Sequence, residues 1–95
     1  MSLKFEWHRR KAASNLSKHG VSFQEAVTVF TDLLARIFDD EDQSMEEQRE
    51  IIIGHSAKER LLVVCFTARE ESVRIINPRK ATKRERKDYE ENSIS

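Results

Sequence analysis

Residues 60–79 read RLLVVCFTAREESVRIINPR, two apolar runs separated by a short charged segment. The first run, Leu61–Phe66, is continuously apolar, which is typical of a central strand covered on both faces. The second run, residues 72–77, follows the turn residues Glu70 and Glu71. This stretch predicts an antiparallel β-hairpin at the centre of a sheet.

Three arginines lie five residues apart on this hairpin and its exit: Arg69, Arg74 and Arg79. A two-residue turn would pair positions whose numbers sum to 141. Thr67, Arg69, Arg74 and Ile76 would then share one face, whereas a one-residue bulge would separate the arginines. Pro78 is expected to end the second strand. Because a guanidinium matches the geometry of a phosphate, the arginines predict an anion-binding surface.

The residues before the hairpin predict a short strand and two helices. Residues 5–7 alternate between apolar and polar side chains, the period of a half-buried strand. A helical pattern from about 8 to 19 ends at Gly20, which suits a left-handed cap. Ser22 and Glu25 form a capping box for the next helix, whose apolar residues recur at helical spacing: Phe23, Ala26, Val27 and Phe30.

The remaining elements complete the domain. The sequence predicts an edge strand over residues 33–38, an acidic loop over about 39–47 and a strand over 49–55. Thr82 and Glu85 form a second capping box, which opens a C-terminal helix.

This order of elements predicts one small α+β domain spanning residues 1–95. We expect an antiparallel sheet of about four strands with two N-terminal helices and one C-terminal helix, all on one face of the sheet. The last few residues are expected to be disordered. The single cysteine, Cys65, lies in the longest apolar run and is expected to be a buried, inert thiol. That run is too short to span a bilayer and the N-terminus lacks an apolar signal core, so we expect a cytoplasmic protein without membrane association.

Opposite charges are segregated along the chain although the formal net charge is zero. Residues 24–50 carry a net charge of −7, and residues 58–87 carry +6. Such segregation fits either a basic binding surface with an acidic flank or a surface whose charges pair with one another.

Short segments along nearly the whole chain, from about residue 4 to 90, resemble the BrnT toxin family. The matching segments are Phe5-Glu6-Trp7, Asn15, Lys18–Phe23, Glu25-Ala26, Val29-Phe30, Ser44–Arg49, Ile53-Gly54, Arg60–Val64, Thr67, Arg69, Arg74–Ile76, Arg79, Ala81-Thr82, Glu85, Arg86 and Tyr89. Their order and spacing make the resemblance specific. The chain departs from the family pattern at His8, Leu33, Gln43 and Asn77-Pro78. The departures at Gln43 and Asn77-Pro78 bear on activity and not on the fold.

The resemblance implies a RelE-like ribonuclease toxin of a type II toxin–antitoxin pair. Its implied partner is a BrnA-like antitoxin with a ribbon-helix-helix DNA-binding fold, so that contact with DNA is only indirect. RNA is the implied substrate. The alternative is a non-catalytic interaction module that binds such an antitoxin and acts as a transcriptional co-repressor.

Cleavage of RNA without a metal requires proton transfer and stabilisation of charge on the phosphoryl oxygens. Arginine suits only the second role, so Arg69, Arg74 and Arg79 are candidate phosphate ligands. Histidine titrates near neutral pH, so His19, with the neighbouring Lys18, is the candidate for proton transfer. Candidate RNA-binding residues on the basic C-terminal segment are Lys80, Lys83, Arg84, Arg86 and Tyr89.

Each candidate has a structural alternative. The arginines are equally suited to ion pairs with Glu70, Glu71 or Glu85, and Tyr89 to anchoring the last helix. Lys18 and His19 lie where a helix C-terminus favours cations regardless of catalysis. No metal or cofactor is expected, because the histidines are scattered and the acidic loop lacks the glycine and spacing of a calcium loop.

Overall fold

The computed structural model describes residues 4–40 and 48–93. Its elements are β1 (Lys4–Glu6), α1 (Arg9–His19), α2 (Phe23–Val29), β2 (Arg36–Asp39), β3 (Glu50–His55), β4 (Leu61–Ala68), β5 (Ser72–Lys80) and α3 (Lys83–Ser93). Most of the expected acidic loop, including Gln43, and the chain end expected to be disordered lie outside the described residues. No helix in the described part is long and apolar enough to cross a membrane.

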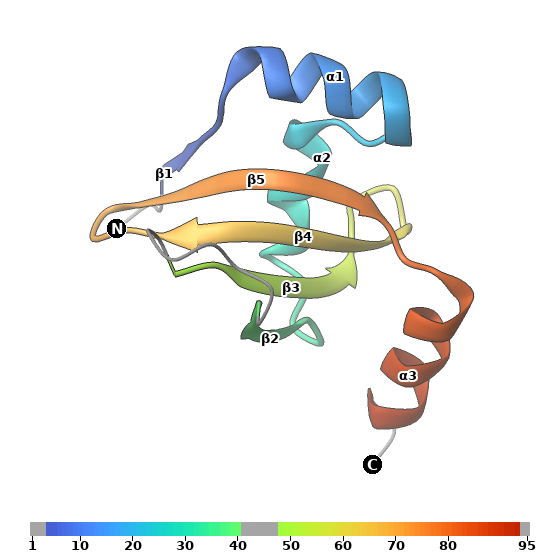
Figure 1. Ribbon diagram of the computed structural model, residues 1–95. Coiled ribbons are helices and arrows are strands. Elements are labelled where there is room, and N and C mark those ends of the chain that lie inside the picture. Colours follow the sequence, from blue (N-terminus) through green and yellow to red (C-terminus); the bar gives the residue numbers. More distant parts are fainter. Residues whose placement is uncertain (1–3, 41–47, 94–95) are drawn as a thin grey trace.

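The five strands form one sheet in the order β1-β5-β4-β3-β2 (Figure 1). The α+β class and the number of helices are confirmed. The expected sheet of about four antiparallel strands was wrong in one respect, because β1 adds a fifth strand that runs parallel to β5. Their pairing covers Lys4 to Glu6 against Ser72 to Arg74, and beyond Arg74 no other described strand pairs with this side of β5.

The hairpin of β4 and β5 has the predicted register near its turn, where Thr67 pairs with Arg74. A bulge at Cys65/Phe66 then shifts the pairing by one residue and leaves Ile76 outside it. The strand does not end at Pro78, as predicted, but continues to Lys80. Proline is tolerated there because this part of β5 is an edge that needs no outward N–H.

Both faces of the sheet are covered, but unequally. In the larger core, apolar residues of α2 and the residue Val21 before it pack against residues of β3, β4 and β5: Val21, Phe23, Ala26, Val29, Ile52, Leu62, Val64, Phe66, Val73 and Ile75. A smaller cluster on the opposite face joins Tyr89 of α3 to Ile53, Leu61 and Val63. The expectation that all helices lie on one face is therefore wrong for α3, whose only large buried apolar side chain, Tyr89, packs on the other face.

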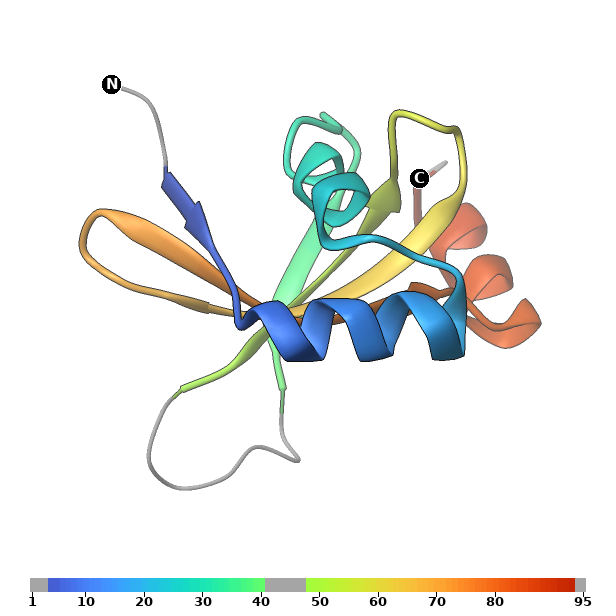
Figure 2. The same cartoon turned by 90° about the horizontal axis from the view of Figure 1, so that it is seen from above.

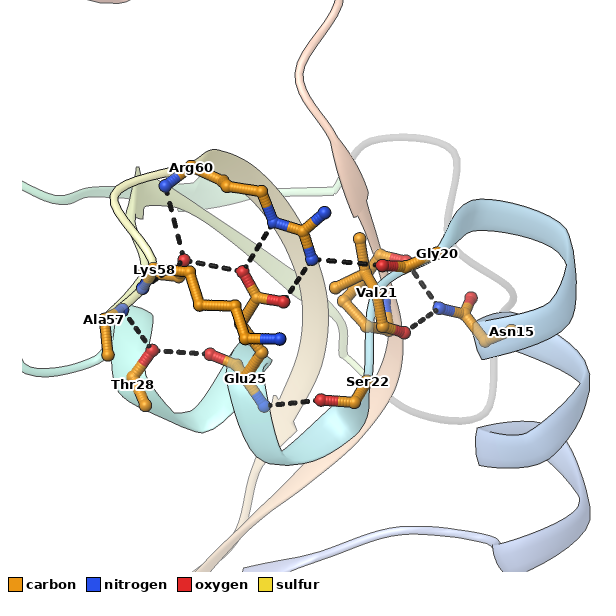
Figure 3. Close-up of polar contacts among 11 residues, drawn as sticks. Asn15, Gly20, Val21, Ser22, Glu25, Thr28, Ala57, Lys58 and Arg60 are labelled. Atoms are coloured by element: carbon orange, nitrogen blue, oxygen red, sulfur yellow. Dashed lines mark hydrogen bonds and ion pairs between the residues drawn. The ribbon is translucent and has the colours of Figure 1, made fainter.

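An ion pair between a buried carboxylate and a half-buried arginine fixes α2 to the turn between β3 and β4 (Figure 3). The carboxylate of Glu25, which is 5% exposed, accepts hydrogen bonds from both Nε and Nη2 of Arg60 and from Oγ of Ser56 at 2.7 Å. Nη2 of Arg60 also donates to the carbonyl of Gly20 at 3.0 Å. The Arg60 hydrogen bonds outweigh burial and lower the pKa of Glu25.

The predicted capping box of α2 is only half formed as a result. The backbone N–H of Glu25 donates to Oγ of Ser22 at 3.0 Å, as expected. The Glu25 carboxylate, however, is committed to Arg60 and Ser56 rather than to the backbone of Ser22. The sequence therefore located the start of α2 correctly. The acidic residue of the capping box, Glu25, binds the distant Arg60 instead of the local backbone.

We predict that Arg60→Met destabilises the protein by about 3 kcal/mol, because it leaves the buried Glu25 carboxylate without its cation. The matched control is Lys58→Met on the same turn, since Lys58 is exposed and should change stability by less than about 0.5 kcal/mol. Urea unfolding at neutral pH measures both. Equal effects of the two substitutions would contradict the role assigned to the ion pair.

Candidate functional site

A pocket of about 340 Å³ lies between α1 and β5. One wall consists of α1 residues at helical spacing: Lys11, Ser14, Asn15, Lys18 and His19. The other wall consists of Ile76, Asn77 and Arg79 of β5. The pocket thus joins a helix to a strand that lies about sixty residues later in the chain, and both views show α1 alongside β5 (Figures 1 and 2).

The side-chain amide of Asn15 holds this pocket together. Its Nδ2 donates to the carbonyl of Pro78 at 2.8 Å and to the carbonyl of Val21 at 3.2 Å. Asn15 is 7% exposed, so both hydrogen bonds form away from water, where an unpaired carbonyl would be costly. The amide thereby fixes α1 to the edge of β5.

Both walls of the pocket carry cationic side chains. Lys11 and Lys18 contribute ammonium groups from α1, and Arg79 lies on β5. None of its eight lining residues is acidic. The chemistry of the lining suits an anion such as a phosphate.

Lys18 and His19 occupy the last turn of α1, as the sequence predicted. Gly20 follows with a φ of 69°, and its N–H donates to the carbonyl of Leu16 at 2.9 Å, which confirms the predicted left-handed cap. The helix C-terminus favours cations at this position. Lys18 and His19 therefore lie at a capped helix C-terminus, as the structural alternative expected. The same geometry places both side chains on the pocket.

Arg79 is held by Glu85 at the start of α3. Its Nη1 and Nη2 donate to the two carboxylate oxygens at 2.7 and 2.8 Å, so the contact is bidentate. Glu85 also accepts from the N–H of Thr82, and Oγ1 of Thr82 accepts from the N–H of Glu85, which confirms the second capping box. The Arg79 hydrogen bonds lower the pKa of Glu85 to about 2. Arg79 thus joins β5, α3 and the pocket.

Arg69 and Arg74 lie on the same face, as the register of the hairpin predicted. Their Nη1 atoms are 3.8 and 3.7 Å from Oε1 of Glu6. This carboxylate of β1 is an ion-pair partner that the sequence did not indicate. The two arginines converge on one anion at the β1 end of β5, apart from the pocket.

The bulge also determines which way Arg79 faces. Arg79 pairs with Val63, and Arg74 pairs with Thr67, and these two partners share a face of β4. Five residues of a regular strand would place Arg74 and Arg79 on opposite faces, but the extra residue returns them to one side. They remain about 16 Å apart along the strand, too far for a single phosphate.

The basic residues of the C-terminal segment are mostly at the surface. Lys80 ends β5, and Lys83, Arg84 and Arg86 are exposed on α3. Tyr89 is only 5% exposed, and its hydroxyl donates to the carbonyl of Leu34 at 3.2 Å. Its ring also packs edge-on against His55. Tyr89 anchors α3, the role that the sequence left open as the alternative to RNA binding.

Five lining residues were not singled out from the sequence as site residues: Lys11, Ser14, Asn15, Ile76 and Asn77. Lys11, Ser14 and Lys18 recur at helical spacing on α1, and this polar stripe is a signal from which the sequence could have indicated a functional helix face. The pairing of that face with β5 has no local signal, because it depends on the tertiary position of Asn15.

Cys65 and the acidic residues give no further site. Burial is the main reason why the pKa of Cys65 rises to about 11, and its thiol lies 3.6 Å from Oδ2 of Asp40. The predicted burial of the thiol is confirmed, and its raised pKa is consistent with an unreactive group. Among the residues that the structure describes, no group of three or more histidine, cysteine, aspartate or glutamate side chains is arranged to hold a metal ion.

The fold is shared with a solved ribonuclease toxin. The crystal structure of the ribonuclease toxin BrnT of Brucella abortus superimposes with a TM-score of 0.66 and 22% sequence identity. The match covers 86% of this chain and all of that one. No curated protein matches the sequence.

The chain belongs to the BrnT family, described as the ribonuclease toxin of a type II toxin–antitoxin system, whose model matches residues 7–85. The family implies ribonuclease activity, an RNA substrate and an antitoxin partner. The alternative of a non-catalytic interaction module is not favoured.

The depressed pKa of Glu85 predicts an acid-dependent loss of its ion pair with Arg79. A carboxylate whose pKa is lower in the folded state stabilises that state above its ordinary pKa of 4.5. This contribution declines as the pH falls from about 4.5 towards 2. We expect Glu85→Gln to lower the unfolding free energy by about 1 kcal/mol at pH 7 and by almost nothing at pH 2. A pH-independent difference in urea unfolding would contradict this assignment.

Proposed function

We propose that the pocket between α1 and β5 is the site at which this toxin cleaves RNA, as an endoribonuclease that needs no metal. The observation that carries the proposal is that Lys18, His19 and Arg79 line one pocket, although they come from distant parts of the chain. They combine an imidazole, the side chain most often used for general acid–base catalysis, with cationic groups that suit a phosphate.

In the proposed reaction, the 2′-oxygen of a ribose attacks the adjacent phosphorus and the bond to the 5′-oxygen breaks. A proton leaves the 2′-hydroxyl and another reaches the 5′-oxygen, which leaves a cyclic phosphate and a free 5′-hydroxyl. His19 carries out proton transfer in this step. Lys11, Lys18 and Arg79 stabilise the charge that develops on the phosphoryl oxygens.

Arg69 and Arg74 have a separate role in this proposal. Their distance from Arg79 along β5 supports contact with RNA phosphates outside the pocket, where RNA displaces Glu6 from the two guanidinium groups. The exposed cations of the C-terminal segment extend this backbone-binding surface: Lys80, Lys83, Arg84 and Arg86. Tyr89 is left out of it because its ring is buried.

The proposed antitoxin is a BrnA-like protein with a ribbon-helix-helix fold, so that the complex contacts DNA only through the antitoxin. The family description, which names a type II toxin–antitoxin system, supports this partner class. The proposed place of action is the cytoplasm, where an RNA substrate is available. An antitoxin that covers the basic pocket would neutralise the toxin by competing with RNA.

We predict that His19→Gln lowers RNA cleavage by about a hundredfold or more, because glutamine has similar size but exchanges no proton. The matched control is His8→Gln, since His8 is exposed before α1 and does not line the pocket. Both proteins are purified without antitoxin and assayed on a broad RNA pool with EDTA present. Growth arrest on expression provides a second measurement.

Three results would overturn parts of the proposal. Full activity of His19→Gln would exclude His19 from proton transfer. Equal losses in His8→Gln and His19→Gln would show that the effect is not specific to the pocket. Loss of wild-type cleavage in EDTA would contradict the metal-independent reaction.

A further inference from the structure

Strand β2 ends the sheet opposite β1 and has all four of its residues exposed. In the described part of the chain, it pairs with β3 on one side only. Its apolar residues Ile37 and Phe38 are 56% and 51% exposed, which is unusual for the edge of a sheet. Such an edge is a template for pairing with another strand (Figure 1).

The pattern of hydrogen bonds with β3 determines which backbone groups of β2 point outward. The N–H of Asp40 donates to the carbonyl of Arg49 at 3.0 Å, so residues 40 and 49 form a hydrogen-bonded pair. In an antiparallel ladder these pairs fall at every second residue. The N–H and C=O groups of Ile37 and Asp39 therefore face away from the sheet.

This constraint limits the ways in which two copies of β2 can pair antiparallel about a two-fold axis. Only the odd-numbered residues of β2 point their N–H and C=O groups outward, so odd-numbered residues of the two copies must pair with one another. The residue numbers of two paired positions therefore sum to an even number. In the register that sums to 76, Phe38 lies opposite Phe38 of the second copy, and Arg36 lies opposite Asp40 of the second copy. The register that sums to 72 would oppose two Arg36 side chains, 74 would oppose each Arg36 to a Phe38, and 78 would oppose two Asp39 side chains.

The side chains of the favoured register are complementary. Arg36, Phe38 and Asp40 alternate along the strand and so lie on one face. Their cross-strand pairs are of the non-hydrogen-bonded type, in which side chains approach most closely. One aromatic contact would thus be flanked on each side by an arginine and an aspartate of different copies, next to the contacts that both residues already make within their own chain.

We propose that two copies of this chain pair through β2 and form one continuous ten-stranded sheet. The α1–β5 pocket lies at the other end of the strand order, so both pockets remain open in the dimer. The pairing is independent of the chemistry in that pocket. Dimerisation and RNA cleavage can therefore succeed or fail separately.

Sedimentation equilibrium tests the pairing on the purified full chain. The wild-type protein should reach twice its 11.2 kDa mass as concentration rises. Ile37→Pro removes an outward N–H but no hydrogen bond to β3, and should abolish the dimer. Arg36→Asp opposes two carboxylates at each ion pair, and should weaken dimerisation at least tenfold. Leu33→Ser is the control, since this 98% exposed side chain lies outside β2, and its dimer should persist.

Thermal unfolding confirms that each variant is folded, and Arg36→Asp decides the matter if Ile37→Pro does not fold. A wild-type protein that stays monomeric at all concentrations would overturn the proposal. So would a dimer that both β2 variants leave intact, or one that Leu33→Ser alone dissociates. A monomer whose binding to antitoxin is weakened by Arg36→Asp would assign the edge to the antitoxin instead.

Discussion

The buried carboxylate of Glu25 imposes the constraint on which the rest of the structure depends. A carboxylate that is almost fully buried needs a cation and hydrogen-bond donors, and Arg60 and Ser56 supply them from the β3–β4 turn. Because Arg60 also binds the carbonyl of Gly20, the same pair fixes the end of α1. Asn15 then ties that helix to β5. The position of the pocket follows from these two contacts.

Local signals in the sequence predicted much of the fold. The capping residues located α2 and α3, and the length of the turn gave the register around Thr67 and Arg74. Features that depend on distant residues were not predictable. They include the parallel pairing of β1 with β5, the bulge at Cys65/Phe66 and the side of the sheet that α3 covers. The requirement for glycine at position 54 is another feature that depends on distant residues. A Cβ at this position would lie 2.8 Å from Cβ of Ala35, a residue that packs against it.

The candidate site was predictable by residue type but not by grouping. Charge and proton chemistry singled out Lys18, His19 and Arg79, which the structure brings to one pocket. The even spacing of the arginines suggested one cluster, but β5 is extended and separates Arg74 from Arg79 by about 16 Å. An acidic residue of β1 that no hairpin pattern could reveal lies between Arg69 and Arg74. The sequence therefore predicted a basic, anion-binding surface. Tertiary contacts divide this surface into the α1–β5 pocket with Arg79 and a separate pair, Arg69 and Arg74.

The most direct test of the central claim is to map where RNA binds. Isotope-labelled His19→Gln protein, which should bind without cleaving, is titrated with a short RNA and followed by amide chemical shifts. We predict the largest shifts on the pocket face of α1, at Lys11, Ser14 and Lys18, and on β5 at Asn77. Shifts confined to β2 and β3, with the α1–β5 pocket unchanged, would contradict the claim that this pocket receives RNA.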